Sequence, residues 1–155
     1  MGRMPPWRRY SISTGVSTPA MKLAAIGAQL AVEEPVASPI MVLGAGATET
    51  ALMSLGGIVT HRSVRVGGAH LDAAIADILR TRFGVVIAPH VAASLKIDIA
   101  SPLGSLRNEV RVVPARTVDS GQPVSVEVSG GLVEAAIADH IRTIVRSVKS
   151  CLREA

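Results

Sequence analysis

Short apolar runs separated by glycine-containing turns fill the middle of the chain. They occupy residues 40–43, 50–55, 58–60 and 63–66 and are rich in Val, Ile, Leu and Met. Runs of this length between turn residues are typical of β-strands. Their close succession predicts a meander.

Three stretches have helical spacing. Residues 21–31 are rich in alanine and are followed by Glu34-Pro35, which predicts a helix that ends near this break. Residues 70–83 place apolar side chains along one face and are followed by Gly84. A third helix is predicted to begin at Pro89, because apolar side chains recur at every fourth position: Val91, Leu95 and Ile99.

The last third of the chain predicts two more strands and a long helix. Residues 110–113 and 124–128 alternate as an antiparallel pair joined through residues 119–123. Residues 132–153 predict the final helix. Its expected buried face consists of Ile137, Ile141, Ile144, Val145, Val148 and Leu152.

Composition fits one domain with a substantial core and excludes an internal disulfide. The chain has 155 residues, of which 48% are hydrophobic and only 2% aromatic, so aliphatic side chains must build the core. The single cysteine, Cys151, suits a reducing compartment and is expected to be a small packed side chain. The four histidines lack metal-ligand spacing, and no metal site is predicted.

The net charge of +4 comes from the N-terminal segment. Arg3, Arg8, Arg9 and Lys22 precede the first acidic residue, Glu33, and the remaining charges balance. No basic stripe or aromatic platform is evident, so we expect no nucleic-acid partner. Residues 1–20 contain several prolines and no apolar period, which predicts a disordered leader.

The clearest candidate for chemistry is the glycine-rich turn between the first two predicted strands. Small residues let the backbone close tightly, and exposed N–H groups in such a turn can cradle a phosphate. Gly67-Gly68 opens a helix farther along and brings helix-terminal N–H groups. Taken alone, a turn of this kind is more often an ordinary turn than a phosphate cradle. The residues of this turn are Gly44, Ala45, Gly46, Ala47 and Thr48.

These motifs, in this order, resemble the second lobe of the bacterial actin-like MreB family. Residues 54–59 read S-L-G-G-I-V and residues 63–68 read S-V-R-V-G-G, as in that family. Residues 95–101 and 24–28 are similar to its I-K-x-E-I-G-S and A-A-A-I-G-A segments. The resemblance extends over residues 24–152.

The resemblance implies an α/β, actin-like ATPase fold of the ribonuclease H-like type, here as a second-lobe fragment with a small α+β inserted subdomain. Residues 21–66 together with 131–155 would form part of the large subdomain. Residues 67–130 would form the insertion. The first lobe of an actin-like ATPase, which positions the attacking water, has no counterpart here, so independent ATP hydrolysis is not expected and no catalytic residue is assigned.

The resemblance also implies a site for ATP with Mg²⁺. In the family the glycine-rich loop wraps the phosphates, which assigns Gly44, Ala45, Gly46, Ala47 and Thr48 here, while Lys96 matches a lysine that lies against the sugar and base. Two positions depart from the pattern. Val42 replaces an aspartate of the magnesium shell, and Ala93 replaces the acidic companion of the lysine. We therefore expect weak nucleotide binding or none.

By family implication, the chain belongs to ATP-linked cytoskeletal filaments that determine rod shape and guide cell-wall synthesis. Expected partners are further copies or full-length MreB-like subunits, inner-membrane morphogenesis proteins and the membrane surface, with a cytoplasmic, membrane-associated location. Two alternatives remain open. One is a degenerate fragment that packs against a full-length relative without nucleotide. The other is a diverged chaperone-type or sugar-kinase-type member of the same superfamily.

Overall fold

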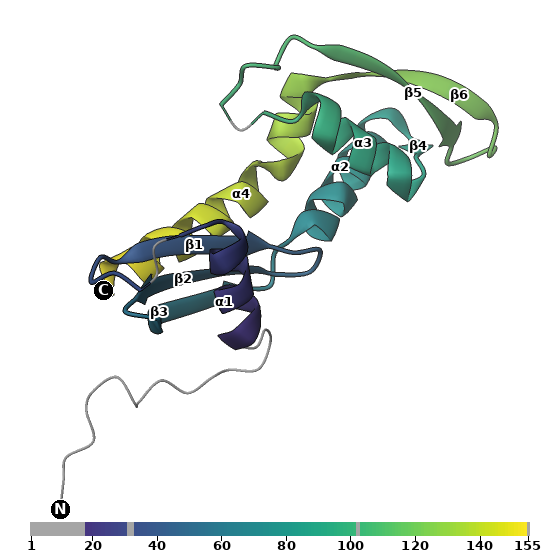
Figure 1. Cartoon of the computed structure of the whole chain (residues 1–155). Helices are drawn as coiled ribbons and strands as arrows, with labels where there is room; N and C mark the ends of the chain where they lie inside the picture. Colours follow the sequence, from purple (N-terminus) through teal and green to yellow (C-terminus); the bar gives the residue numbers. More distant parts are fainter. Residues whose placement is uncertain (1–17, 31–32, 102, 155) are drawn as a thin grey trace, which may run out of the picture. The chain divides into compact units, whose positions relative to one another are not determined.

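The computed structural model describes residues 18–30, 33–101 and 103–154 (Figure 1). Most of the predicted leader therefore lies outside the described residues. The chain forms two compact units. Of the described residues, those within 1–43, 48–64 and 146–155 form the first, unit 1, and those within 44–47 and 65–145 form the second, unit 2.

Unit 1 is built around an antiparallel sheet of three strands in the order β1-β2-β3. The strands are β1 (Ser38–Leu43), β2 (Thr48–Ser54) and β3 (Gly57–Val64). Helix α1 (Thr18–Gly27) covers one face of the sheet, as Figure 1 shows. The buried side chains between them are Met21, Ala25, Ile40, Ala51 and Met53. The last turns of α4 lie against the other face, where Cys151 contacts Thr50.

Two details of unit 1 differ from the sequence prediction. Residues 58–60 and 63–66 are not separate strands, because β3 is continuous through His61 and Arg62. Polar residues do not break a strand whose one face is partly exposed. Helix α1 ends at Gly27 rather than at residue 31. There Gln29 adopts a left-handed φ of 54°, and the Leu30 N–H bonds the Ala25 carbonyl, a Schellman-type ending.

Unit 2 places helices on one face of a second sheet. Helix α2 (Gly68–Phe83), helix α3 (Pro89–Ile99) and the first part of α4 (Gly130–Arg153) cover the sheet of order β4-β5-β6. Its strands are β4 (Val85–Val86), β5 (Val110–Thr117) and β6 (Pro123–Ser129). The prediction of Val91, Leu95 and Ile99 as a buried stripe is confirmed. Strand β4 was not predicted, because a two-residue strand has no measurable period.

Helix α4 confirms the predicted burial of Ile137 and Ile144 but not that of Val145 and Leu152. Val145 and Leu152 are 44% and 47% exposed, whereas the adjoining positions Ile144 and Cys151 are buried. The buried positions Val133, Ile137, Ile144 and Cys151 are separated by four or seven residues. A helix repeats its contacts at this spacing when it packs along its length. The predicted face was therefore displaced by one position in the second half of the helix.

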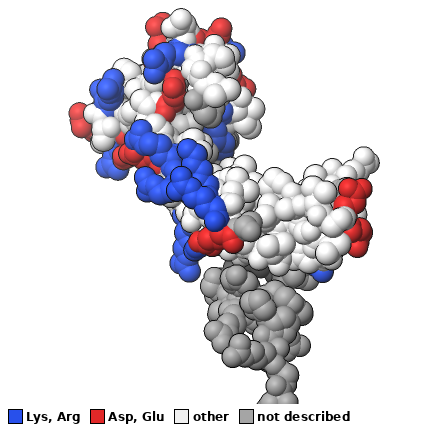
Figure 2. Space-filling view, turned by 90° about the vertical axis from the view of Figure 1, so that its left-hand side faces the viewer, with Lys and Arg blue, Asp and Glu red and all other residues white. Residues whose placement is uncertain are grey.

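The outer face of α4 also corrects the charge analysis. Arg146, Lys149 and Arg153 are exposed and lie three and four residues apart, which places them on one face of the helix. Figure 2 shows several Lys and Arg side chains on the face that it draws. The expectation that no basic stripe exists is wrong for this helix. Among the described residues, no helix is long and apolar enough to cross a membrane.

Candidate functional site

The glycine-rich turn is a tight loop at residues 44–47 that joins β1 to β2. The Gly44 N–H donates to the Ala47 carbonyl at 2.9 Å and closes the loop. Positive φ among described non-glycine residues occurs only at Gln29 and Leu55, so Ala45 and Ala47 lie in regions open to alanine. The two alanines that depart from the family's loop therefore fit this backbone without strain.

The loop is joined to the start of α2 by main-chain hydrogen bonds. The Gly68 N–H donates to the Gly44 carbonyl and the Ala69 N–H donates to the Ala45 carbonyl, both at 2.9 Å. The first N–H groups of a helix lack partners within it, and here the loop carbonyls supply them. The helix start is near the loop, as predicted, but these two N–H groups are already occupied.

Gly67 makes this close approach possible. A Cβ atom at this residue would lie 2.5 Å from the Gly44 oxygen and 2.6 Å from the Ala45 oxygen, distances that real Cβ atoms do not adopt. Glycine is therefore required at position 67 because of the close backbone approach. We call the contact of residues 44–45 with residues 67–69 the loop–helix joint.

Among the described residues, N–H groups inside the loop remain available. The N–H groups of Ala45 and Gly46 form no hydrogen bond with another described residue. A Cβ atom built at Gly46 would meet nothing within 4 Å, so the space beside this residue is open. Adjacent N–H groups on an open turn are the feature that binds anions in backbone nests.

Lys96 lies at the same joint. Its Nζ is 2.7 Å from Oδ1 of Asp72 and donates to the Gly68 carbonyl at 3.3 Å. The lysine and aspartate side chains are about one quarter exposed, at 24% and 25%. The structure thus brings Lys96 to the residues that hold the glycine loop. Asp72 serves as its acidic partner, a pairing that sequence reasoning did not identify.

Thr48 and Glu49 begin strand β2 and belong to unit 1. Both are buried, with 1% and 2% of their surface exposed. One carboxylate oxygen of Glu49, Oε2, forms no hydrogen bond with a described residue and lies 3.9 Å from Nε2 of His61. Val42 is the cross-strand neighbour of Glu49 and packs with the apolar cluster under α1. No group of three metal-binding side chains occurs among the described residues.

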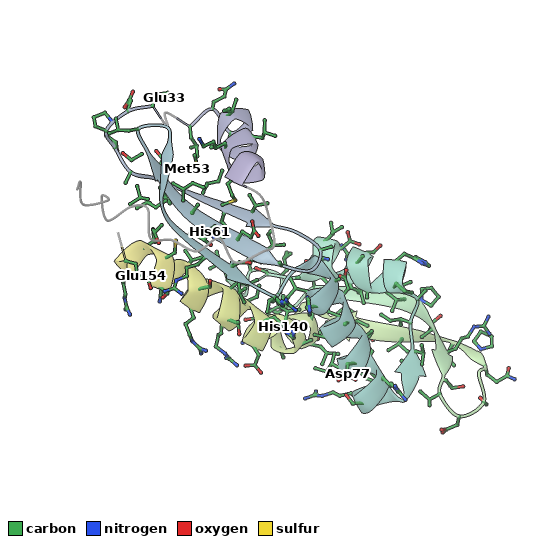
Figure 3. All side chains as sticks on the ribbon, turned by 90° about the horizontal axis from the view of Figure 1, so that it is seen from below. Glu33, Met53, His61, Asp77, His140 and Glu154 are labelled. Atoms are coloured by element: carbon green, nitrogen blue, oxygen red, sulfur yellow. The ribbon has the colours of Figure 1, made fainter. Side chains whose placement is uncertain are left out.

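Sequence reasoning missed His70. Its Nδ1 accepts a hydrogen bond from the Gly67 N–H at 3.2 Å, so the third residue of α2 caps the residue before the helix. The His70 ring lies 6.4 Å from the ring of His140, which α4 contributes (Figure 3). The signal available in the sequence was the spacing, because a residue three positions after the N-cap is placed to reach back to it.

Cys151 is fully buried, as expected of a small packed side chain. Its Sγ contacts the Thr50 carbonyl at 3.6 Å on the sheet face covered by α4. Burial raises the pKa of the Cys151 thiol above its ordinary value. A thiol in this state is protonated at neutral pH and is a poor nucleophile.

A family model described as MreB/Mbl protein matches residues 16–155. The chain is similar to the cell shape-determining protein MreB of Haemophilus influenzae, with 37% identity over 133 residues that cover 84% of this chain and 38% of that protein. It is also similar to the cell shape-determining protein Mbl of Bacillus subtilis, with 30% identity over 131 residues, 84% of this chain and 39% of that protein. The chain thus spans less than half the length of these relatives.

Solved structures confirm the actin-like fold expected from the motifs. MreB5 of Spiroplasma citri bound to AMPPNP superposes with a TM-score of 0.81 at 27% identity, over 87% of this chain and 40% of that one. The same protein bound to ADP gives a TM-score of 0.82. A MamK double helical filament, at 20% identity, gives 0.62 and supports the fold alone.

Proposed function

Because the chain belongs to the MreB/Mbl family, we propose that it serves as the nucleotide-contacting part of the second lobe of an actin-like cytoskeletal protein. The observation that carries this proposal is the glycine loop. It is fixed to α2 through the loop–helix joint, and the N–H groups of Ala45 and Gly46 remain unbonded beside open space.

The proposed ligand is the phosphate chain of ATP or ADP. The N–H groups of Ala45 and Gly46 would donate to phosphate oxygens, and Gly44 and Ala47 would keep the loop closed. The ammonium group of Lys96 adds a positive charge at the joint, where its Nζ already contacts the Gly68 carbonyl. Thr48 follows the loop and is included in the site as the first residue of β2.

The described residues provide no comparable site for the magnesium ion that accompanies ATP. Val42 stands where the family's aspartate does, and an aliphatic side chain cannot bind a cation or its water. Its cross-strand neighbour Glu49 is buried beside His61 rather than held open for a metal. We therefore propose that the residues present hold phosphate through backbone N–H groups with little help from Mg²⁺.

At the level of the cell, we propose a role in the filaments that determine rod shape and guide cell-wall synthesis. Support comes from two relatives named cell shape-determining proteins, MreB and Mbl. Proposed partners are full-length subunits of such filaments, inner-membrane morphogenesis proteins and the cytoplasmic membrane surface. The family match favours this role over the chaperone-type and sugar-kinase-type alternatives.

The second candidate is a fragment that assembles with a full-length relative without binding nucleotide. The Val42 side chain favours it, because this residue packs in the apolar cluster of unit 1 and leaves the magnesium shell without its acid. The occupied N–H groups of Gly68 and Ala69 favour it as well, since they are not free to bind phosphate. A binding measurement separates the two candidates.

The test is thermal unfolding of the full chain, followed by circular dichroism, with and without ATP and with and without Mg²⁺. A ligand at 100 times its dissociation constant stabilises a fold by about 2.7 kcal/mol, which shifts the melting temperature measurably. We expect ATP to raise it and Mg²⁺ to add little. Gly46→Val, which fills the open side of the loop, should abolish the shift.

The matched control is Gly27→Val, because a Cβ atom at Gly27 also meets nothing within 4 Å but lies at the end of α1. This variant should retain the response to ATP. A melt of the wild-type chain that ATP leaves unchanged would reject the nucleotide-contacting role and favour the second candidate. A response that survives Gly46→Val would show that the nucleotide binds elsewhere.

A further inference from the structure

Among the described residues, the imidazole of His70 accepts a hydrogen bond from the loop–helix joint. The Gly67 N–H donates to its Nδ1 at 3.2 Å. A nitrogen that accepts a hydrogen bond carries no proton, so this contact requires an unprotonated Nδ1. Protonation of Nδ1 would replace the acceptor with a donor that faces another donor.

The capped residue is the one that sets the geometry of the loop. Gly67 approaches the Gly44 and Ala45 carbonyls more closely than a side chain allows. The next two N–H groups, of Gly68 and Ala69, hold those carbonyls. Gly67 is followed directly by Gly68, so a change in the hydrogen bond of the Gly67 N–H also affects the position of the Gly68 N–H that donates to the loop.

The surroundings of His70 do not offset a positive charge. The titratable side chains near the joint, among the described residues, are His140 from α4 and the ion pair between Lys96 of α3 and Asp72 of α2. Asp72 is already engaged by Lys96 at 2.7 Å, and the loop residues 44–47 carry no titratable side chain. A charged His70 would also sit at the N-terminus of α2, where the helix dipole disfavours a cation.

We propose that His70 is a positioning residue of the glycine loop, and that its neutral imidazole keeps the loop–helix joint closed. Gain of a proton at Nδ1 removes this acceptor, opens the joint and weakens phosphate binding. The phosphate-binding part of this inference rests on the proposed function, whereas the closing of the joint does not.

The experiment measures amide hydrogen exchange of the full chain by NMR between about pH 5 and pH 8, the interval in which imidazoles change charge. Protection factors of Gly67, Gly68 and Ala69 are compared after correction for the intrinsic rate. We expect protection to fall about fivefold toward the acidic end, the change that loss of an ordinary cap produces. The same pH series is then repeated with ATP, by recording its dissociation constant.

Three variants make the test specific. His70→Gln retains a side-chain acceptor at the position that a capping box uses, but cannot gain a proton, and should give high protection at every pH. His70→Ala should give low protection at every pH. His90→Gln removes an exposed histidine near the start of α3 and should behave like the wild-type chain.

A flat pH profile in the wild-type chain, or a profile that His70→Gln leaves unchanged, would overturn the inference. The latter result would assign the titration to His140. ATP binding that strengthens as the pH falls would overturn the phosphate-binding part. Absence of ATP binding at every pH, with the exchange pattern as expected, would reject the proposed function but leave the role of His70 in the joint supported.

Discussion

At the scale of single residues, the geometry of the loop depends on Gly67 more than on the glycines inside the loop. Gly44 and Gly46 adopt no positive φ, and Gly46 has open space around it. Gly67, by contrast, has two carbonyl oxygens where a Cβ would stand. The glycine that sequence reasoning placed at the opening of a helix is thus the residue whose small size allows the loop to dock.

Cys151 allows a prediction about alkaline pH. Burial raises the pKa of its thiol, so the folded chain favours the protonated form. The unfolded chain ionises this thiol once the pH exceeds its ordinary value of about 8.5, and ionisation then favours unfolding. The contribution to stability is therefore complete below that pH and decreases as the pH rises.

The measurement is the urea midpoint of the wild-type chain and of Cys151→Ser from about pH 7.5 to about pH 10. Because a serine hydroxyl does not titrate in this range, the pH dependence of the Cys151→Ser variant reports the contribution of all other titratable groups. We expect the wild-type chain to lose stability relative to Cys151→Ser as the pH rises. A constant difference would show that the thiol ionises equally in both states.

At the scale of elements, α4 tests which helical stripe builds the core. Val133 is completely buried in unit 2, whereas Val145 on the same helix is 44% exposed. Val133→Ala removes buried carbon and leaves a cavity, which should cost about 2 kcal/mol of unfolding free energy. Val145→Ala should be neutral or slightly stabilising, because alanine is the better helix former.

The two variants are compared by urea unfolding of the full chain, with equal slopes required before midpoints are converted to free energies. Both exchange the same residue types in the same helix, so their difference isolates packing. Equal destabilisation by the two variants would contradict the assigned stripe. It would instead favour the stripe that sequence periodicity predicted, in which Val145 is buried.

The elements were more predictable than their ends and faces. The apolar runs and the positions Val91, Leu95 and Ile99 were sufficient to locate most strands and helix α3. The end of α1 was missed because Gln29, rather than a glycine, takes the left-handed position. The face of α4 was missed because two candidate stripes differ by one residue, and only packing against a real neighbour decides between them.

The candidate site was predictable to a lesser degree. The glycine loop and Lys96 were proposed from motifs, and the structure places Lys96 beside the start of α2, whose N–H groups donate to the loop carbonyls. The pairing of Lys96 with Asp72 and the cap from His70 were not foreseen. Both depend on side-chain directions at a helix N-terminus, which a sequence read without its fold does not specify.

At the scale of the whole molecule, the chain corresponds to a limited part of its relatives. It matches 38% of the Haemophilus influenzae MreB and 40% of the Spiroplasma citri MreB5 chain. The match includes the sheet of unit 1 and the helices and sheet of unit 2, both of which have their own buried clusters. The chain therefore contains only part of the structure that such a relative provides.

This correspondence predicts that the chain joins filaments made by a full-length relative. A second lobe of the same fold can occupy the place of a complete subunit only on the side that it contains, so we expect it to bind and then to stop growth.

The experiment mixes the chain with full-length Haemophilus influenzae MreB under polymerising conditions and sediments the filaments. The chain is expected in the pellet, with shorter filaments in electron micrographs as its proportion rises. The chain spun alone must stay in the supernatant, since pelleting without the relative would reflect aggregation through open strand edges. The filament role would be refuted if the relative sediments with unchanged filament lengths and the chain stays in solution. Nucleotide binding is decided separately, by the thermal unfolding measurement.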